Sequence, residues 1–165
     1  MIFMSQSGLT DRAREAEWDQ WYVEHLRIMR TVDGIASAQR FRTRDAGWPH
    51  SLAMYSIRSA DVFDDAYYQS VRGMGEWLPL IDRRQYRRNL FEGLEYAPEV
   101  FPGQVLWVAD RASPDLELSG CRFSWLRAVG LDRTTPFRGI AVVPAKADAG
   151  EAGRAGVAVY EAIIG

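Results

Sequence analysis

The sequence predicts an α+β fold in which a βαββαβ unit is followed by a second, partial βαββ unit. Three observations lead to this fold class. A strongly amphipathic helical stretch gives way at Gly34 to alternating side chains. Short strand-like runs are separated by turn residues, and the later part of the chain repeats the earlier element types. With 165 residues, 47% of them hydrophobic, the chain can bury the core of one compact domain.

The first unit is expected within residues 1–100 and begins with an apolar strand at residues 1–4. Thr10 or Asp11 can cap a helix that extends to about residue 31. One face of this helix collects residues that recur every three or four positions, namely Trp18, Trp21, Tyr22, His25, Leu26 and Met29. Gly34 then supplies the left-handed conformation that ends a helix at little cost.

The rest of the first unit is predicted from changes in periodicity. Residues 35–44 alternate in polarity and residues 52–57 form a second apolar run, so the two make a hairpin across a turn. Ser59 can cap a second helix that Gly73 ends. A last strand is expected near residues 90–96.

Residues 104–165 are predicted to be a partial βαββ repeat packed with the first unit as one compact domain. Several residues recur at one constant spacing, pairing Gly34 with Gly139, Ile35 with Ile140, Ala53 with Ala158, and Tyr55 with Tyr160. This alignment predicts a strand at residues 106–109, a helix at residues 115–131 capped at Ser113, and two strands that end at Ile164.

Composition excludes several classes of function. The formal charge of −2 gives no general attraction for nucleic acid, so the basic run at residues 82–88 is interpreted as a solvated or intersubunit face. Cys121 is the single cysteine, which excludes an intrachain disulfide and favours a cytoplasmic location. No apolar run approaches the length of a membrane span, so no membrane partner is expected.

Three short stretches resemble a known family, namely Trp21-Tyr22-x-Glu24-His25, Gly34-Ile35-x-Ser37-Ala38-x-Arg40-Phe41 and Leu52-Ala53-Met54-Tyr55. They are similar to motifs of the EthD-like branch of the dimeric α+β barrel superfamily, over roughly residues 1–95. The resemblance implies a ferredoxin-like dimeric α+β barrel and a homodimer. Relatives of this kind include cofactor-free cyclases and oxygenases of polyketide metabolism, dehydratases, degradative isomerases and haem-binding enzymes. The second half departs from the pattern, because Gly130 and Ala145 align with His25 and Arg40.

His25 is the sharpest candidate for chemistry. An imidazole has an ordinary pKa near ~6.5, so it can exchange a proton at neutral pH, and its aromatic surroundings indicate a partly desolvated pocket. Trp18, Trp21 and Tyr22 are the candidate walls of that ligand site. The structural alternative is a core histidine bonded to a backbone carbonyl, with the three rings as ordinary core.

Arg40 and Tyr55 are the candidate partners of His25, because a cation and a phenol can stabilise an enolate or phenolate as charge develops. Arg42 is interpreted as solvent-exposed, and a solvated strand face is the alternative for Arg40. Glu24 is expected to pair with Arg27, three residues further along the helix, rather than to orient His25.

No metal site and no cofactor are expected. The chain has only two histidines, and no carboxylate lies at ligand spacing from either. His50 follows Trp48-Pro49 in a predicted turn and is expected to be exposed. Glycine-rich phosphate loops and a serine nucleophile elbow are missing from the sequence, while haem held by His25 stays open as an alternative.

The resulting hypothesis is a cofactor-free lyase, cyclase or isomerase that acts on a small hydrophobic carbonyl compound, aromatic or polyketide-like. His25 shuttles the proton, and Tyr55 or Arg40 stabilises the oxyanion. The rival hypothesis is a noncatalytic module that binds a small ligand or serves dimerisation. A solvent-connected cavity beside His25 would favour the enzyme, and a dry, packed histidine would favour the module.

Overall fold

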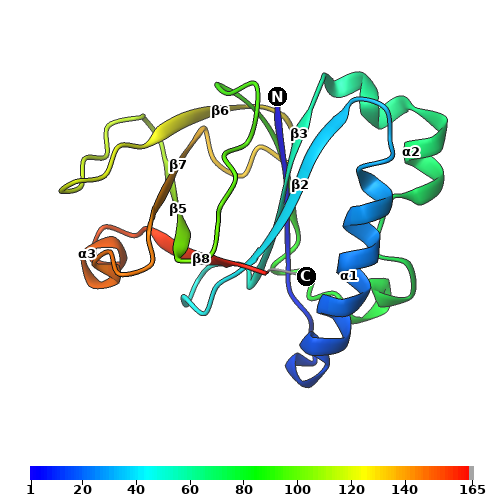
Figure 1. Cartoon of the computed structure of the whole chain (residues 1–165), viewed down its shortest axis with the longest axis horizontal. Helices are drawn as coiled ribbons and strands as arrows, with labels where there is room; N and C mark the ends of the chain where they lie inside the picture. Colours follow the sequence, from blue (N-terminus) through cyan, green and yellow to red (C-terminus); the bar gives the residue numbers. More distant parts are fainter. Residues whose placement is uncertain (164–165) are drawn as a thin grey trace.

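The computed structural model describes residues 1–163, which form an α+β fold around a closed, antiparallel barrel of eight strands. The strands are β1 (Ile2–Ser7), β2 (Ile35–Arg42), β3 (Ser51–Ile57), β4 (Arg87–Glu92), β5 (Gln104–Arg111), β6 (Ser124–Leu131), β7 (Phe137–Pro144) and β8 (Ala158–Ala162). Around the barrel they follow the order β1-β3-β2-β8-β5-β7-β6-β4. The helices α1 (Glu15–Met29), α2 (Ala66–Val71) and α3 (Ala149–Arg154) lie outside the barrel (Figure 1).

Each half of the chain contributes four neighbouring strands in the same order. The first half is ordered β4-β1-β3-β2 and the second β8-β5-β7-β6. The halves join where β2 pairs with β8 and where β4 pairs with β6. The predicted second unit lacks a last helix and strand, which would leave an open sheet edge. The barrel instead closes within one chain, so this expectation is wrong.

Residues 2–92 have the predicted βαββαβ order. The apolar face of α1 packs on the sheet, and Gly34, with a φ of 86°, turns the chain into β2. The second helix is shorter than predicted. Ser59 caps a 3-10 turn at Ala60–Asp64, and Asp65 then caps α2 by accepting a bond from the Tyr68 amide.

The two faces of the first four-stranded sheet have different roles. One face lines the barrel interior with apolar residues such as Met4, Phe41 and Leu52. The other face packs under α1 and α2, which lie side by side on the outer side of β2 and β3 (Figure 1). This outer layer places the aromatic stripe of α1 against the sheet.

The predicted helix at residues 115–131 is wrong. Ser124–Leu131 is strand β6, whose Leu126 and Ala128 face the barrel core with the period of two that defines a strand. The predicted alignment of the two halves at one constant spacing is also wrong. Gly139 lies inside β7, whereas Tyr160 lies on β8, which pairs with β2 and β5 rather than with β7. The strand predicted to end at Ile164 ends at Ala162, and residue 164 lies outside the described residues.

The outer face of the second half has a different cover. The six-residue helix α3, capped by Asp148, and the chain between β5 and β6 pack on it. α3 lies on the opposite side of the molecule from α1 and α2 (Figure 1). Within residues 104–163, α3 is the one α-helix, and it precedes β8 as α2 precedes β4.

Candidate functional site

His25 lies on the inner face of α1 and is 9% exposed. Its ring stacks on Trp21, with centroids 4.8 Å apart and an interplanar angle of 11°, and meets the edge of Tyr22 at 5.5 Å. Within residues 1–163, no hydrogen bond joins either imidazole nitrogen to another group. The predicted structural role, a bond to a backbone carbonyl, is therefore wrong.

The protonation state of His25 follows from its surroundings. Burial disfavours the charged imidazolium and lowers the pKa of His25 to about 4. The ring is therefore neutral at pH 7, with a free lone pair on one nitrogen and a hydrogen on the other. In this state His25 can accept a proton, as a general base does.

A cavity of about 40 Å³ adjoins His25 between the helices and the sheet. Its walls include the predicted residues Tyr22 and Tyr55, each 2% exposed, so the structure brings three of the six candidate residues together. Burial raises the pKa of Tyr22 to about 12 and holds the pKa of Tyr55 well above its usual range. Both phenols stay protonated at neutral pH and can donate a hydrogen bond to an oxyanion.

Arg88 also lines this cavity, although the basic run at residues 82–88 was predicted to be a solvated or intersubunit face. It lies on β4 with its guanidinium carbon 5.3 Å from the Phe3 ring, and it donates to the Tyr68 hydroxyl at 3.3 Å. The strand begins at Arg87, earlier than predicted. Alternation along β4 then places Arg88 and Leu90 on the helix-covered face, and this signal was present in the sequence.

Arg40 and Trp18 do not reach this cavity. Arg40 is 3% exposed and lies on the other side of Tyr22, its guanidinium carbon 4.0 Å from that ring and 4.5 Å from the Trp18 ring. Its charge is balanced by Asp19, with Nη1 2.5 Å from Oδ1. The predicted solvated position of Arg40 is wrong. Arg40 also does not line the cavity beside His25.

The remaining predicted residues also have defined places. Trp21 covers His25 from the outer side and is half-buried, but it does not line the cavity. Glu24 accepts two hydrogen bonds from Arg27 at 2.6 and 2.8 Å, as predicted. His50 is half-buried rather than exposed, because its amide bonds the Gln85 side chain.

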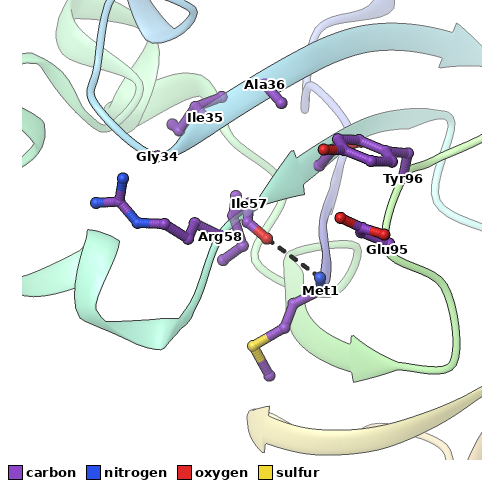
Figure 2. A pocket seen from close by; sticks show the side chains of 9 residues that line it. Met1, Gly34, Ile35, Ala36, Ile57, Arg58, Glu95 and Tyr96 are labelled. Atoms are coloured by element: carbon purple, nitrogen blue, oxygen red, sulfur yellow. Dashed lines mark hydrogen bonds between the residues drawn. The ribbon is translucent and has the colours of Figure 1, made fainter.

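A separate pocket of about 320 Å³ opens at the end of the barrel where β1 begins (Figure 2). In Figure 2, Glu95 and Tyr96 approach it from the segment after β4, and Met1 lies at its base, where the amino group donates to the Ile57 carbonyl at 3.1 Å. Arg58 in its wall is paired with Asp33 at 2.9 Å. None of the predicted site residues lines this pocket.

The described residues hold no group of three or more His, Cys, Asp or Glu side chains suited to a metal ion. The cavity beside His25 does not fit haem in this conformation, since its 40 Å³ is far below the ~300 to 1,000 Å³ of pockets for drug-sized ligands. No helix within residues 1–163 has both the length and the apolar character required to cross a membrane.

Comparison with known proteins shows a likeness of fold. No family model matches the chain, and no curated protein matches it. A solved structure described as "Crystal structure of Putative Chlorite dismutase TA0507" superposes with a TM-score of 0.58 at 12% identity, covering 99% of this chain and 95% of that one. At this identity the likeness shows the fold alone, an α+β barrel.

Proposed function

We propose that this protein is a cofactor-free enzyme that moves a proton on a small hydrophobic carbonyl compound, as a lyase, cyclase or isomerase. The observation that carries the proposal is the state of His25. A neutral imidazole with no hydrogen bond to residues 1–163 stands at a cavity that two protonated phenols also line. A histidine with a purely structural role is expected to use its nitrogens in hydrogen bonds, because a buried polar group without a partner costs free energy.

The proposed step divides the work among three residues. His25 takes a proton from the carbon next to the substrate carbonyl, so that a C–H bond breaks and an N–H bond forms. The electron pair moves onto the carbonyl oxygen as an enolate, and the Tyr55 hydroxyl donates a hydrogen bond to it. The Arg88 cation adds a favourable potential in a site of low dielectric. The role first considered for Arg40 passes to Arg88.

The cavity accepts a carbonyl group but not a whole aromatic or polyketide-like molecule. In the proposal, the substrate body enters when the segment around Met74 and Tyr86, which form part of the cavity wall, moves outward. Gly73 and Gly75, with φ values of 98° and 51°, precede and begin the 3-10 turn at Gly75–Leu80 and supply the backbone freedom for such a movement.

Membership in the EthD-like branch and a ferredoxin-like description of each half are part of the proposal. They are supported by the βαββαβ order of residues 2–92 and by the position of two motif residues, His25 and Tyr55, at one cavity. The homodimer stays a prediction. It gains no support from an open sheet edge, because the barrel is closed. Light scattering at micromolar concentration tests it, and a mass of only 18.7 kDa would count against it.

A noncatalytic ligand-binding or dimerisation module is the second candidate, and the small volume of the His25 cavity favours it. If the helix-covered face never opens, the aromatic residues of α1 are core and His25 binds only water. A cavity of this size has room for such waters.

Hydrogen–deuterium exchange at carbon separates the two candidates without knowledge of the natural substrate. Aryl ketones and 1,3-diketones are incubated with the protein in D₂O, and loss of the α-proton signal is followed by NMR. We expect the protein to accelerate exchange, His25→Gln to abolish the acceleration, and His50→Gln to retain it. Because the base must be neutral, the rate should persist from pH 8 to about 5.5 and fall towards the His25 pKa of about 4.

Equal exchange rates with and without His25, or none above the background for the whole panel, would contradict the enzyme and favour the module. Thermal unfolding of His25→Gln and His25→Ala serves as the control for folding. Gln keeps polar atoms where the imidazole stood but cannot carry a proton at neutral pH, so a folded and inactive His25→Gln variant isolates the chemistry.

A further inference from the structure

A third pocket lies where β2 ends and β3 begins, beside the N-terminal part of α1. Its volume is about 350 Å³, within the range of small-molecule sites. Its walls hold four guanidinium groups and two carboxylates, contributed by Arg12, Arg40, Arg42, Arg44, Glu15 and Asp19. The pocket therefore has two positive charges in excess, although the whole chain has a formal charge of −2.

The positive charges are unequally compensated. Arg12 is paired with Glu15 at 2.9 Å, and Arg40 is paired with Asp19 at 2.5 Å. The Arg42 Nη2 lies 3.6 Å from the Asp19 carboxylate, which is beyond hydrogen-bond distance. Arg44 is exposed and makes no hydrogen bond or ion pair within residues 1–163. The donors of Arg42 and Arg44 are thus available to a ligand.

The floor of the pocket adds neutral donors. The Ser51 hydroxyl accepts a bond from the Arg40 Nε at 3.1 Å, so its own hydrogen is free to donate. Trp18 Nε1 and His50 Nδ1 also belong to wall residues, and both are buried without a partner among the described residues. Neighbouring atoms cover these nitrogens, so contact with a ligand requires a small shift of the wall.

We propose that this pocket binds a small molecule through a doubly charged oxyanion, either a phosphate monoester or a dicarboxylate. Two guanidinium groups with free donors match the planar, forked geometry by which arginine binds phosphate and carboxylate. A dianion would neutralise the excess charge, and the Ser51 hydroxyl would supply a further hydrogen bond. Tyr22 and Arg40 separate this pocket from the cavity of His25, so the proposal stands without the proposed enzyme activity.

Isothermal titration with inorganic phosphate and with malonate tests the proposal and distinguishes its two ligand classes. We expect saturable binding of one probe, with an affinity that falls as NaCl is raised because the site is open to solvent. Arg42→Gln with Arg44→Gln should weaken that binding at least about tenfold, since two charge-assisted contacts are lost. The matched control is Arg122→Gln with Arg154→Gln, which removes the same charge from exposed positions in the second half. This control should change the binding affinity less than about twofold.

Tighter binding of phosphate assigns the site to phosphate esters, and tighter binding of malonate assigns it to dicarboxylates. Two outcomes overturn the proposal: neither probe binds saturably at millimolar concentration, or the control pair weakens binding as much as the pocket pair. Circular dichroism of both double variants shows that they are folded, which is expected because Arg42 and Arg44 are exposed.

Discussion

The two halves of the barrel share a strand order but differ in what covers their outer faces. The first half carries the 15-residue α1 together with α2, whereas the second half, as far as residue 163, carries the six-residue α3 and the chain between β5 and β6. Under α1 and α2 lie titratable side chains such as His25, Arg40 and Arg88. The buried outer cluster of the second half is apolar, made of Val105, Trp107, Ala109, Phe123, Ala141, Val143, Ala152 and Val157. The strand order thus sets barrel closure, and the cover sets the chemistry.

The contrast has a packing origin. Trp18 and Tyr22 place large, rigid rings between α1 and the sheet, and rings of this kind leave gaps when they meet at edges and faces. The buried residue of α3 is Ala152, whose single methyl group allows close contact with the sheet. The gap between the rings and the sheet in the first half includes the cavity beside His25.

The largest predicted effect comes from two buried ion pairs, one in each half. Arg138 is fully buried in the barrel and depends on Asp110, at 2.7 and 2.9 Å, for its charge pairing. Asp110→Ala should lower the free energy of unfolding by about 3 to 5 kcal/mol, because a buried charge is left alone. Asp19→Ala should cost less, since Arg40 keeps Ser51 and two aromatic rings. Urea unfolding measures both, and equal losses would contradict the ranking.

The pH dependence of stability is the next largest effect. The folded pKa of His25, about 4, lies below its ordinary value of 6.5, so the unfolded chain binds the proton first as the pH falls. The stabilisation is full above about pH 6.5 and is lost towards pH 4. We expect the free energy of unfolding to fall by roughly 2 to 3 kcal/mol between pH 7 and 4.5 through this residue.

His25→Gln should remove that part of the pH dependence, and His50→Gln should leave it. Unfolding by urea at several pH values gives the comparison. A pH dependence that persists in His25→Gln and is unchanged in His50→Gln would point to carboxylates instead, because the chain has no other histidine.

A smaller effect compares two glycines of the second half. A methyl group at Gly139, on β7, would lie 3.0 Å from the Trp125 ring, so Gly139→Ala should destabilise by about 1 to 2 kcal/mol. Gly153, in α3, has open space around it, and Gly153→Ala should stabilise by up to ~1 kcal/mol through helix propensity. Thermal unfolding checks the opposite signs. A stabilising Gly139→Ala would show that the Trp125 ring can move aside.

The smallest expected effect is at the surface of α1. The Glu24–Arg27 pair is 58% and 61% exposed, so water already solvates both charges. Glu24→Gln should leave the melting temperature unchanged within error in differential scanning calorimetry. A clear decrease would mean that α1 depends on its outer face, and the contrast between the two covers would need another explanation.

Much of the first half could be predicted from the sequence because its signals are local. The period of α1, the glycine at its end and the apolar run of β3 each depend on neighbouring residues only. The second half was mispredicted where a few matching residues outweighed local periodicity. The alternation of Ser124–Leu131 indicates a strand, yet the alignment imposed a helix on it.

The candidate site was predicted in part for a similar reason. His25 and Tyr22 are one helical turn apart, so their meeting follows from helix geometry. The separation of Arg40 from His25 depends on how α1 crosses β2, which no local pattern specifies. Arg88 was missed because charge composition was considered before strand alternation.

Closure of the barrel by a single chain also removes a constraint of symmetry. A barrel built from two identical subunits carries every substitution twice, so a residue useful in one sheet must be tolerated in the other. Here the sheets are different stretches of one polypeptide, joined by residues 93–103. Each stretch can therefore change independently. Because the barrel closes within one chain, its formation is a unimolecular step whose equilibrium constant does not depend on protein concentration.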